Sequence, residues 1–184
     1  MVKKFDIPDS LFHISVRHDK KYLRFGYDES QINSPFWGLK LLFGKFTPAH
    51  PIELRRDITF GIEKSELLPT NLHIYYVISF KLIEAFNEAD IKGFGTYPLI
   101  SRDNSFHPNE YFGITVTGRV KGKFVGPLMP LVLESNPVGI DIMLLEEGGL
   151  TSGTTIINNR VLEVLNKFSI PNIEIREVII TGRE

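Results

Sequence analysis

The pattern of apolar and polar positions repeats once along the chain. Residues 77–100 align without a gap with residues 156–179, at a constant offset of 79 residues. Both segments show a β-prone stretch, a helix cap, a helical face, a breaker and a second β-prone stretch. We therefore predict a repeated strand–helix–strand unit. The identical pairs are Ile78/Ile157, Glu84/Glu163, Asn87/Asn166, Ile91/Ile170 and Ile100/Ile179.

The helical part of each segment follows a residue that can cap it. Ser79 precedes the first helix and Asn158 or Asn159 the second, and such side chains accept hydrogen bonds from the first backbone N–H groups of a helix. Gly93 is suited to a left-handed conformation behind the first helix, and residues 171–172 (Pro-Asn) end the second. The predicted apolar faces comprise Leu82, Ile83, Phe86 and Ala89 in one segment and Val161, Val164, Leu165 and Phe168 in the other.

Most of the remaining chain has the alternation of strands. Residues 12–16 (FHISV) alternate, and residues 18–21 suggest a hairpin turn into a second strand over residues 22–27. Residues 36–46 are strongly apolar, with two glycines that argue against a long helix. Residues 139–145 (GIDIMLL) predict a buried strand. Other strands are predicted over residues 53–62, 111–120 and 128–133, with a turn at residues 122–126.

These elements predict an α+β fold of mainly antiparallel strands, with two short amphipathic helices in the repeated unit. Residues 101–109 are polar, contain a proline and lack periodicity, which favours a linker. We predict a strand-rich half over residues 1–104 and a second half over residues 105–184, which can pack as a single domain. The alternative is convergence, because a strand–helix–strand unit is common enough to recur independently. Nothing convincing aligns upstream of either segment, so the sequence does not support a duplication of the whole half.

Composition narrows the function without selecting one. The formal net charge of −1 gives no electrostatic footprint for nucleic acid or an anionic membrane. The absence of cysteine removes disulfides, thiolate nucleophiles and Cys-ligated zinc. No apolar run approaches the roughly 20 residues of a membrane span, and none of signal-peptide length follows the first residues. We therefore expect a cytoplasmic protein.

The ionisable residues form no local catalytic or metal-binding motif. The five histidines show no HxH, HExxH or HxxxH spacing, so neither a metal nor a cofactor is predicted. Asp141 stands inside an otherwise apolar run, where a buried charge would need a partner such as Arg160 or Arg176. The favoured interpretation places Asp141 on the solvent face of an antiparallel strand. The histidines are His13, His18, His50, His73 and His107.

Residues 148–155 (GGLTSGTT) are the best candidate for a phosphate-binding loop, because they are rich in glycine and threonine shortly before a helix. They lack the lysine of a P-loop and the GxGxxG spacing, so a flexible turn is the favoured interpretation. Ser15, Ser79 and Ser152 stand in no GxSxG elbow, which argues against an α/β-hydrolase. Small basic spots, too few for a nucleic-acid binder, lie at Lys20, Lys21, Arg55, Arg56, Lys121 and Lys123.

The repeated unit resembles the C-terminal element of some bacterial immunity proteins from polymorphic toxin and contact-dependent inhibition systems. The likeness rests on the strand, the Ser- or Asn-capped helix and the final strand, over residues 156–178 and more loosely over residues 77–99. It implies a cytosolic, non-enzymatic protein that neutralises a toxin domain by covering its active site. Such a binder needs a pre-organised surface of complementary charge.

Two other hypotheses stay open beside this protein-binding role. An enzyme or small-ligand protein would have a pocket between the two halves, with Asp141, the glycine-rich residues 148–153 and His107 as the first suspects. A role in an assembly would expose several of the fourteen phenylalanines. The sequence assigns no catalytic, ligand-binding or interface residue.

Overall fold

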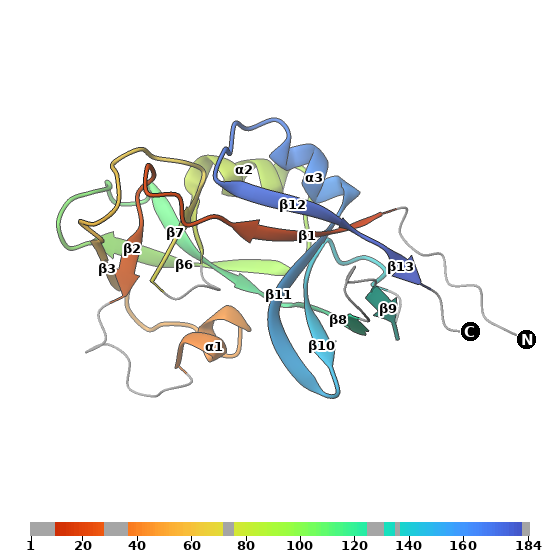
Figure 1. The fold of residues 1–184 in the computed structure, drawn as a ribbon. Helices are drawn as coiled ribbons and strands as arrows, with labels where there is room; N and C mark the ends of the chain where they lie inside the picture. Colours follow the sequence, from red (N-terminus) through yellow and green to blue (C-terminus); the bar gives the residue numbers. More distant parts are fainter. Residues whose placement is uncertain (1–9, 28–36, 72–75, 125–130, 135–136, 182–184) are drawn as a thin grey trace, which may run out of the picture.

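Strands form most of the regular structure and lie in two curled mixed sheets, with three helices among the described residues (Figure 1). The computed structural model describes residues 10–27, 37–71, 76–124, 131–134 and 137–181. The fold is therefore of the α+β class, as the sequence predicts. None of the helices described is long and apolar enough to cross a membrane.

One sheet contains six strands in the order β2-β3-β6-β7-β5-β4. Its strands are β2 (Phe25–Tyr27), β3 (Ile52–Arg56), β4 (Leu67–Pro69), β5 (Tyr76–Ser79), β6 (Phe94–Ser101) and β7 (Tyr111–Val116). The strand β3 runs parallel to β6, and the other neighbours are antiparallel.

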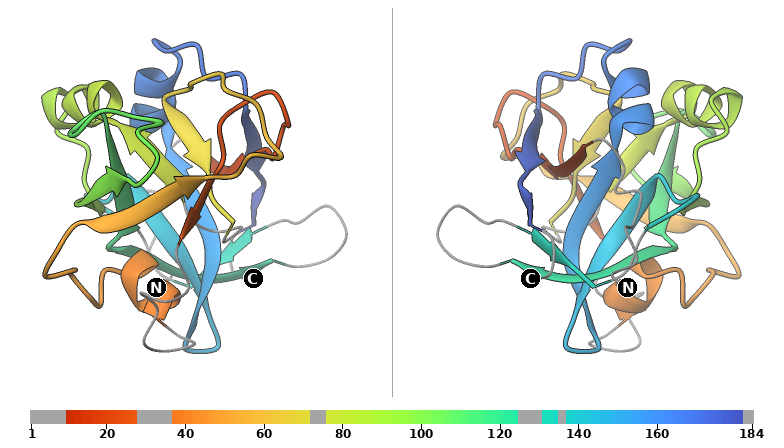
Figure 2. Two further views of the ribbon diagram at one scale, coloured as in Figure 1. Left: turned by 90° about the vertical axis from the view of Figure 1, so that its left-hand side faces the viewer. Right: turned by 90° about the vertical axis from the view of Figure 1, so that its right-hand side faces the viewer.

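The second sheet contains seven strands in the order β12-β1-β11-β10-β8-β9-β13. Its strands are β1 (Leu11–Val16), β8 (Gly118–Phe124), β9 (Leu131–Leu133), β10 (Ile142–Glu147), β11 (Leu150–Asn158), β12 (Ile173–Val178) and β13 (Ile180–Thr181). The strands β12 and β13 follow one another directly in the chain but lie at opposite edges of this sheet. The sheet is therefore curled so strongly that its two edges meet (Figure 2). The pairs β8–β10 and β9–β13 are parallel, so both sheets are mixed.

The helices of both repeated segments begin at predicted capping residues. The helix α2 (Phe80–Glu88) starts after Ser79, whose Oγ accepts the N–H three residues on at 3.2 Å. The helix α3 (Asn159–Leu165) starts after Asn158, whose Oδ1 accepts the equivalent N–H at 3.3 Å. Each cap satisfies a backbone donor that the helix start leaves free. The buried helical side chains are Leu82, Ile83 and Phe86 in α2, and Val161, Val164 and Leu165 in α3.

The helix ends differ from the prediction. The helix α2 ends in a Schellman motif, in which the Ile91 N–H donates to the Phe86 carbonyl at 2.9 Å. The left-handed position behind the helix is Asp90, with φ of 52°, whereas Gly93, with φ of 96°, lies just before β6. The prediction for Gly93 as the cap is therefore wrong, and α3 also ends at Leu165, ahead of the predicted proline.

The two strand–helix–strand segments are built into their sheets in the same way. β5 and β6 lie on either side of β7, and β11 and β12 lie on either side of β1, with each middle strand antiparallel to both neighbours. The middle strands share a pattern, FHISV in residues 12–16 and FGITV in residues 112–116. Equivalent cross-strand pairs are Phe12/Ile157 and Phe112/Ile78, and Val16/Ile173 and Val116/Phe94.

Next to the first strand of each segment lies a further strand, and the acidic residue that precedes this further strand contacts the helix cap. Glu66 precedes β4 and Asp141 precedes β10, and these strands pair with β5 and β11 in matching register. Ser79 Oγ donates to the Glu66 carboxylate, and Asn158 Nδ2 donates to the Asp141 carboxylate at 2.7 Å. The cap N–H also donates to the carbonyl of the acidic residue, at 2.9 Å in the first segment and 3.1 Å in the second.

Each middle strand comes from the other half of the chain. The strand β1 precedes the first strand–helix–strand segment but lies within the second, and β7 precedes the second segment but lies within the first. The predicted division at residues 104–105 falls in the loop between β6 and β7, which are paired neighbours. The two predicted halves are therefore interlocked in space.

Two apolar cores lie on opposite faces of the seven-stranded sheet. The main core includes the buried faces of both sheets and of α2 and α3. A smaller core lies inside the curl of the seven-stranded sheet. β10 contributes Ile142 and Leu144 to the main core, and Met143 and Leu145 to the smaller one. Burial on both faces explains the continuous apolar run and confirms the predicted buried strand.

Some local predictions fail because long-range pairing decides the outcome. Residues 18–21 form no hairpin between β1 and β2, which lie in different sheets, because Leu23 N–H donates to the Glu63 carbonyl at 2.8 Å instead. The predicted strand over residues 111–120 is divided at Thr117, where the chain passes between the sheets. Of the predicted turn at residues 122–126, residues 122–124 are part of β8, and residues 125–126 lie outside the described residues. The apolar residues 36–46 contain a short helix, α1 (Trp37–Leu42).

The predicted linker is an anchored loop. The Asp103 carboxylate accepts hydrogen bonds from Ser105 Oγ at 2.6 Å, Ser101 Oγ at 2.8 Å and the Arg56 N–H at 2.9 Å. Desolvation of Asp103 opposes its charge, but these hydrogen bonds together outweigh it and lower its pKa to about 2. Phe106 is buried, with its ring edge-to-face against Phe25 at 5.2 Å. Polar composition here reflects a hydrogen-bonded turn, not a flexible connection.

Gly113 is a position where one added methyl group should matter. Tyr97 faces Gly113 across the β6–β7 pair, and a Cβ on Gly113 would lie 1.9 Å from Tyr97 Cζ. The buried Tyr97 hydroxyl is held by that of Tyr27 at 2.8 Å, so the ring has little freedom to move. We expect Gly113→Ala to lower the free energy of unfolding by about 2–3 kcal/mol in urea denaturation. Gly26→Ala is the control, because its nearest neighbours would be 3.9 Å away; equal losses in both variants would contradict the steric argument.

Candidate functional site

Asp141 lies between the start of α3 and the residues that follow α2, and only 2% of it is exposed. Its carboxylate accepts hydrogen bonds from the Lys92 backbone N–H at 2.7 Å, Asn158 Nδ2 at 2.7 Å and Arg160 Nη1 at 3.0 Å. The solvent-facing position favoured by the sequence is therefore wrong. Of the two proposed partners it is Arg160 that binds, whereas Arg176 lies in β12.

The Arg160 guanidinium connects this carboxylate to the end of α2. Its Nη2 donates to the Ala89 carbonyl at 2.6 Å, while Nη1 donates to Asp141. The carboxylate is thus enclosed by donors that the fold supplies, which compensates its desolvation. This geometry describes a structural clamp between the units, not a general base facing a substrate.

Gly148 and Gly149 form the tight turn of the β10–β11 hairpin, with φ of 58° and 81°. Two consecutive positive φ values are those of a type I′ turn, which glycine adopts at low cost. The nine residues after them form the strand β11, and only then does α3 begin. The phosphate-loop hypothesis is wrong, because the turn and the helix start lie at opposite ends of a strand.

The suspected catalytic residues are not brought together. Asp141 lies beside the start of α3, Gly148 at the hairpin tip, and His107 in the loop between β6 and β7 (Figure 1). The His107 backbone N–H donates to the Glu110 carboxylate at 2.9 Å. Within the described ranges, no group of three or more His, Asp or Glu side chains could hold a metal ion. His13 and Ser15 lie in β1, His18 after β1, His50 before β3, and Ser152 in β11, and His73 lies outside the described residues.

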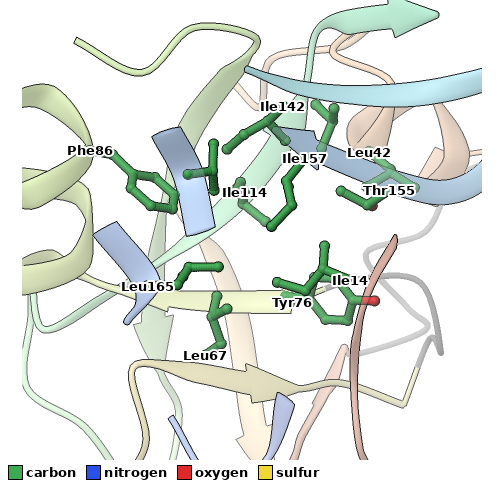
Figure 3. A pocket seen from close by; sticks show the side chains of 12 residues that line it. Ile14, Leu42, Leu67, Tyr76, Phe86, Ile114, Ile142, Thr155, Ile157 and Leu165 are labelled. Atoms are coloured by element: carbon green, nitrogen blue, oxygen red, sulfur yellow. The ribbon is translucent and has the colours of Figure 1, made fainter. Parts of the chain in front are cut away.

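An apolar cavity of about 40 Å³ lies between the sheets, and side chains from α1, α2 and α3 also line it (Figure 3). Both predicted halves contribute to it, as a pocket between them requires. Its volume is far below the roughly 300 Å³ at which ordinary small-molecule sites begin. The lining residues are Ile14, Leu42, Leu67, Tyr76, Phe86, Ile114, Val116, Ile142, Thr155, Ile157, Val161 and Leu165.

If this cavity is an internal packing defect, filling it should stabilise the fold. We expect Val161→Ile, which adds one methylene at the wall, to raise the free energy of unfolding by about 0.5–1 kcal/mol. Val77→Ile is the matched control, because Val77 is equally buried but does not line the cavity. We expect the control to destabilise by about 1 kcal/mol through overpacking. Thermal unfolding measures both, and a loss in Val161→Ile would show that the cavity cannot accept the added group.

A basic lobe, defined as residues 17–27 and 52–64, presents the most exposed large apolar side chain among the described residues. Ile58 is 85% exposed and Ile62 is 70% exposed. Seven basic and four acidic side chains give the lobe a formal charge of +3, on a chain whose net charge is −1. The lobe is held together by β2–β3 pairing and forms the left-hand side of Figure 1, which faces the viewer in the left panel of Figure 2.

The loop that carries the two isoleucines is pre-formed. Asp57 Oδ1 accepts hydrogen bonds from the Thr59 N–H at 3.0 Å and from Thr59 Oγ1 at 2.6 Å. The Gly61 N–H donates to the Lys20 carbonyl at 2.7 Å. A Cβ on Gly61 would lie 2.0 Å from the Lys21 carbonyl oxygen, so only glycine allows this close approach.

The sequence pattern does not reveal this surface. It predicted a strand over residues 53–62, whereas β3 ends at Arg56 because the Asp57 turn redirects the chain. The signal was present as an Asp two residues before a Thr, followed by a glycine. Exposure of the isoleucines, however, follows from the packing of the lobe and has no local signature.

No protein-family model matches this chain, and no curated protein matches its sequence. The surface and interior chemistry of the chain itself must therefore indicate its function.

Proposed function

We propose that this chain is a non-enzymatic protein-binding module. The observation that carries the proposal is the pair Ile58 and Ile62, which stand largely in solvent on a pre-formed loop. Apolar side chains on a rigid loop bury surface on association while little conformational entropy is lost. The stiffness of β-branched side chains lowers that cost further.

The interior chemistry supports binding over catalysis. Asp141, the most buried carboxylate among the described residues, is bound by donors from Lys92, Asn158 and Arg160 and so serves the structure. The cavity is small and apolar. An enzymatic or small-ligand role, the alternative hypothesis, draws no support from the geometry of the described residues.

We propose further that the partner is a cognate bacterial toxin domain met in the cytoplasm, in line with the resemblance of the repeated units to immunity proteins. The test is co-expression with each product of the neighbouring reading frames. Protection from a toxic product, together with a stoichiometric complex in gel filtration, is the expected result. A toxic neighbour that neither binds the chain nor is neutralised by it would contradict the immunity role.

We also propose that residues 1–104 and 105–184 are copies of one unit that have exchanged their first strands. The equivalent registers of the middle strands and the matching acid–cap contacts support this. Burial agrees at all five identical pairs: Ile78/Ile157 and Ile91/Ile170 are buried, whereas Glu84/Glu163, Asn87/Asn166 and Ile100/Ile179 are exposed.

A further inference from the structure

We infer that the basic lobe is the binding surface of this protein and that its partner is an acidic face of another protein. Ile58 and Ile62 form the apolar centre of this contact, and Lys20 and Lys21 form part of its charged rim. The inference rests on the proposed protein-binding function and adds the place of contact and the charge of the partner.

The distribution of charge selects an acidic partner. The lobe carries a formal charge of +3, so the rest of the chain carries −4 within a total of −1. Two of its cations pair with carboxylates outside the lobe, Arg17 with Glu174 and Lys64 with Glu110, which leaves the lobe an excess of one positive charge. Lys21 pairs with Glu63 inside the lobe, but its side chain remains 58% exposed. An acidic surface is attracted to the lobe and repelled by the remainder, which orients its approach. The lysines are close to the apolar pair because Gly61 pairs with the Lys20 backbone, directly beside Ile62.

The exposed side chains favour a protein partner over nucleic acid. Single-stranded nucleic acid is held by aromatic side chains on which bases stack. The aromatic residues Tyr22, Phe25 and Tyr27 of the lobe are buried, and the Phe60 ring packs against Arg24 at 4.8 Å. The largest exposed apolar groups are instead aliphatic, which is the chemistry of an interface centre.

A second copy of this chain does not fit the same surface. Two positively charged lobes repel one another when they are brought face to face by a two-fold axis. A contact between the lobe and the acidic remainder of another copy would be head-to-tail, and such contacts extend into chains unless they close into rings. Sedimentation of the purified protein distinguishes both from a monomer.

The test uses the full chain, immobilised, with a nuclease-treated lysate of its source cells as probe. Four proteins are compared: the unaltered chain, Ile58→Asp/Ile62→Asp, Lys20→Glu/Lys21→Glu, and Leu150→Asp as control. Leu150 is 77% exposed at the hairpin tip, so its variant has the same change of chemistry on a different surface. Circular dichroism verifies that each variant is folded. The retained protein is then purified and its affinity measured at low and at high salt.

We expect one stoichiometric acidic protein, bound at least about a hundredfold more weakly by the isoleucine variant. The lysine variant should associate about tenfold more slowly and with a smaller dependence on salt, and Leu150→Asp should bind normally.

If the isoleucine variant binds the partner as tightly as the unaltered chain does, the lobe is not the binding surface, although the protein-binding function remains. Salt-independent binding unaffected by the lysine change would overturn the acidic partner. Three other outcomes would overturn the inference: the chain retains no protein, it retains only nucleic acid from a lysate that was not treated with nuclease, or it self-associates through the lobe. Retention of no protein would also contradict the proposed function.

Discussion

Fragments 1–104 and 105–184, produced separately, are expected to lack cooperative structure and to regain it when mixed. Each fragment lacks the middle strand of its own unit: β7 lies in the second fragment but pairs with β5 and β6 of the first. Likewise β1 lies in the first fragment but pairs with β11 and β12 of the second. Without these strands, the neighbours on either side lose their ladders and much of their apolar cover.

Circular dichroism and amide NMR dispersion of each fragment, alone and after mixing, measure this effect. A full chain cleaved only at an inserted site between residues 104 and 105 controls for the break itself, which lies in a surface loop. Either fragment folding cooperatively alone would contradict the prediction. That outcome would mean that β1 can take the place of β7 in the first fragment, or β7 that of β1 in the second, since the two strands share the FxI[S/T]V pattern.

Asp141→Ala is expected to lower the free energy of unfolding by about 3 kcal/mol. The substitution leaves two donors, the Lys92 N–H and the Asn158 amide, without their acceptor at a junction shared by both units. Arg160, whose side chain is 52% exposed, can turn to water, so the loss comes mainly from the two part-buried neutral donors. Urea denaturation at neutral pH measures the difference.

Two comparators separate the clamp from a general effect of charge. Asp141→Asn keeps one acceptor oxygen and should lose less than the alanine variant. Glu147→Ala removes an exposed carboxylate at the end of β10 and should change stability by less than about 0.5 kcal/mol. A small loss in Asp141→Ala, comparable to that in Glu147→Ala, would show that Asp141 does not hold the units together.

The repeated segments illustrate why part of the fold was predictable. Helix starts depend on a side chain and a backbone N–H three residues apart, so Ser79 and Asn158 could be identified locally. The helical faces likewise follow from the 3.6-residue period. The related middle strands escaped detection because residues 12–16 and 112–116 stand 100 residues apart, whereas the segments they serve stand 79 apart.

The candidate surface was not predictable for a different reason. Ile58 and Ile62 have the composition and spacing of strand residues, and only the Asp57 turn and the approach of Gly61 to residues 20–21 place them in solvent. The same applies in reverse to Asp141, whose burial depends on donors from positions 92, 158 and 160. A buried charge and an exposed apolar group are both decided by distant neighbours.

By itself the sequence determined the α+β class, the two capped helices, the buried strand β10 and the absence of cysteine chemistry, because each depends on local spacing or composition. Only the tertiary structure decided which strands pair, that β1 lies between β11 and β12 and β7 between β5 and β6, that Asp141 binds Arg160, and that the basic lobe presents two isoleucines. Strand pairing satisfies backbone donors and acceptors with any sequence of suitable shape, so its partners are chosen by the packing of the whole chain.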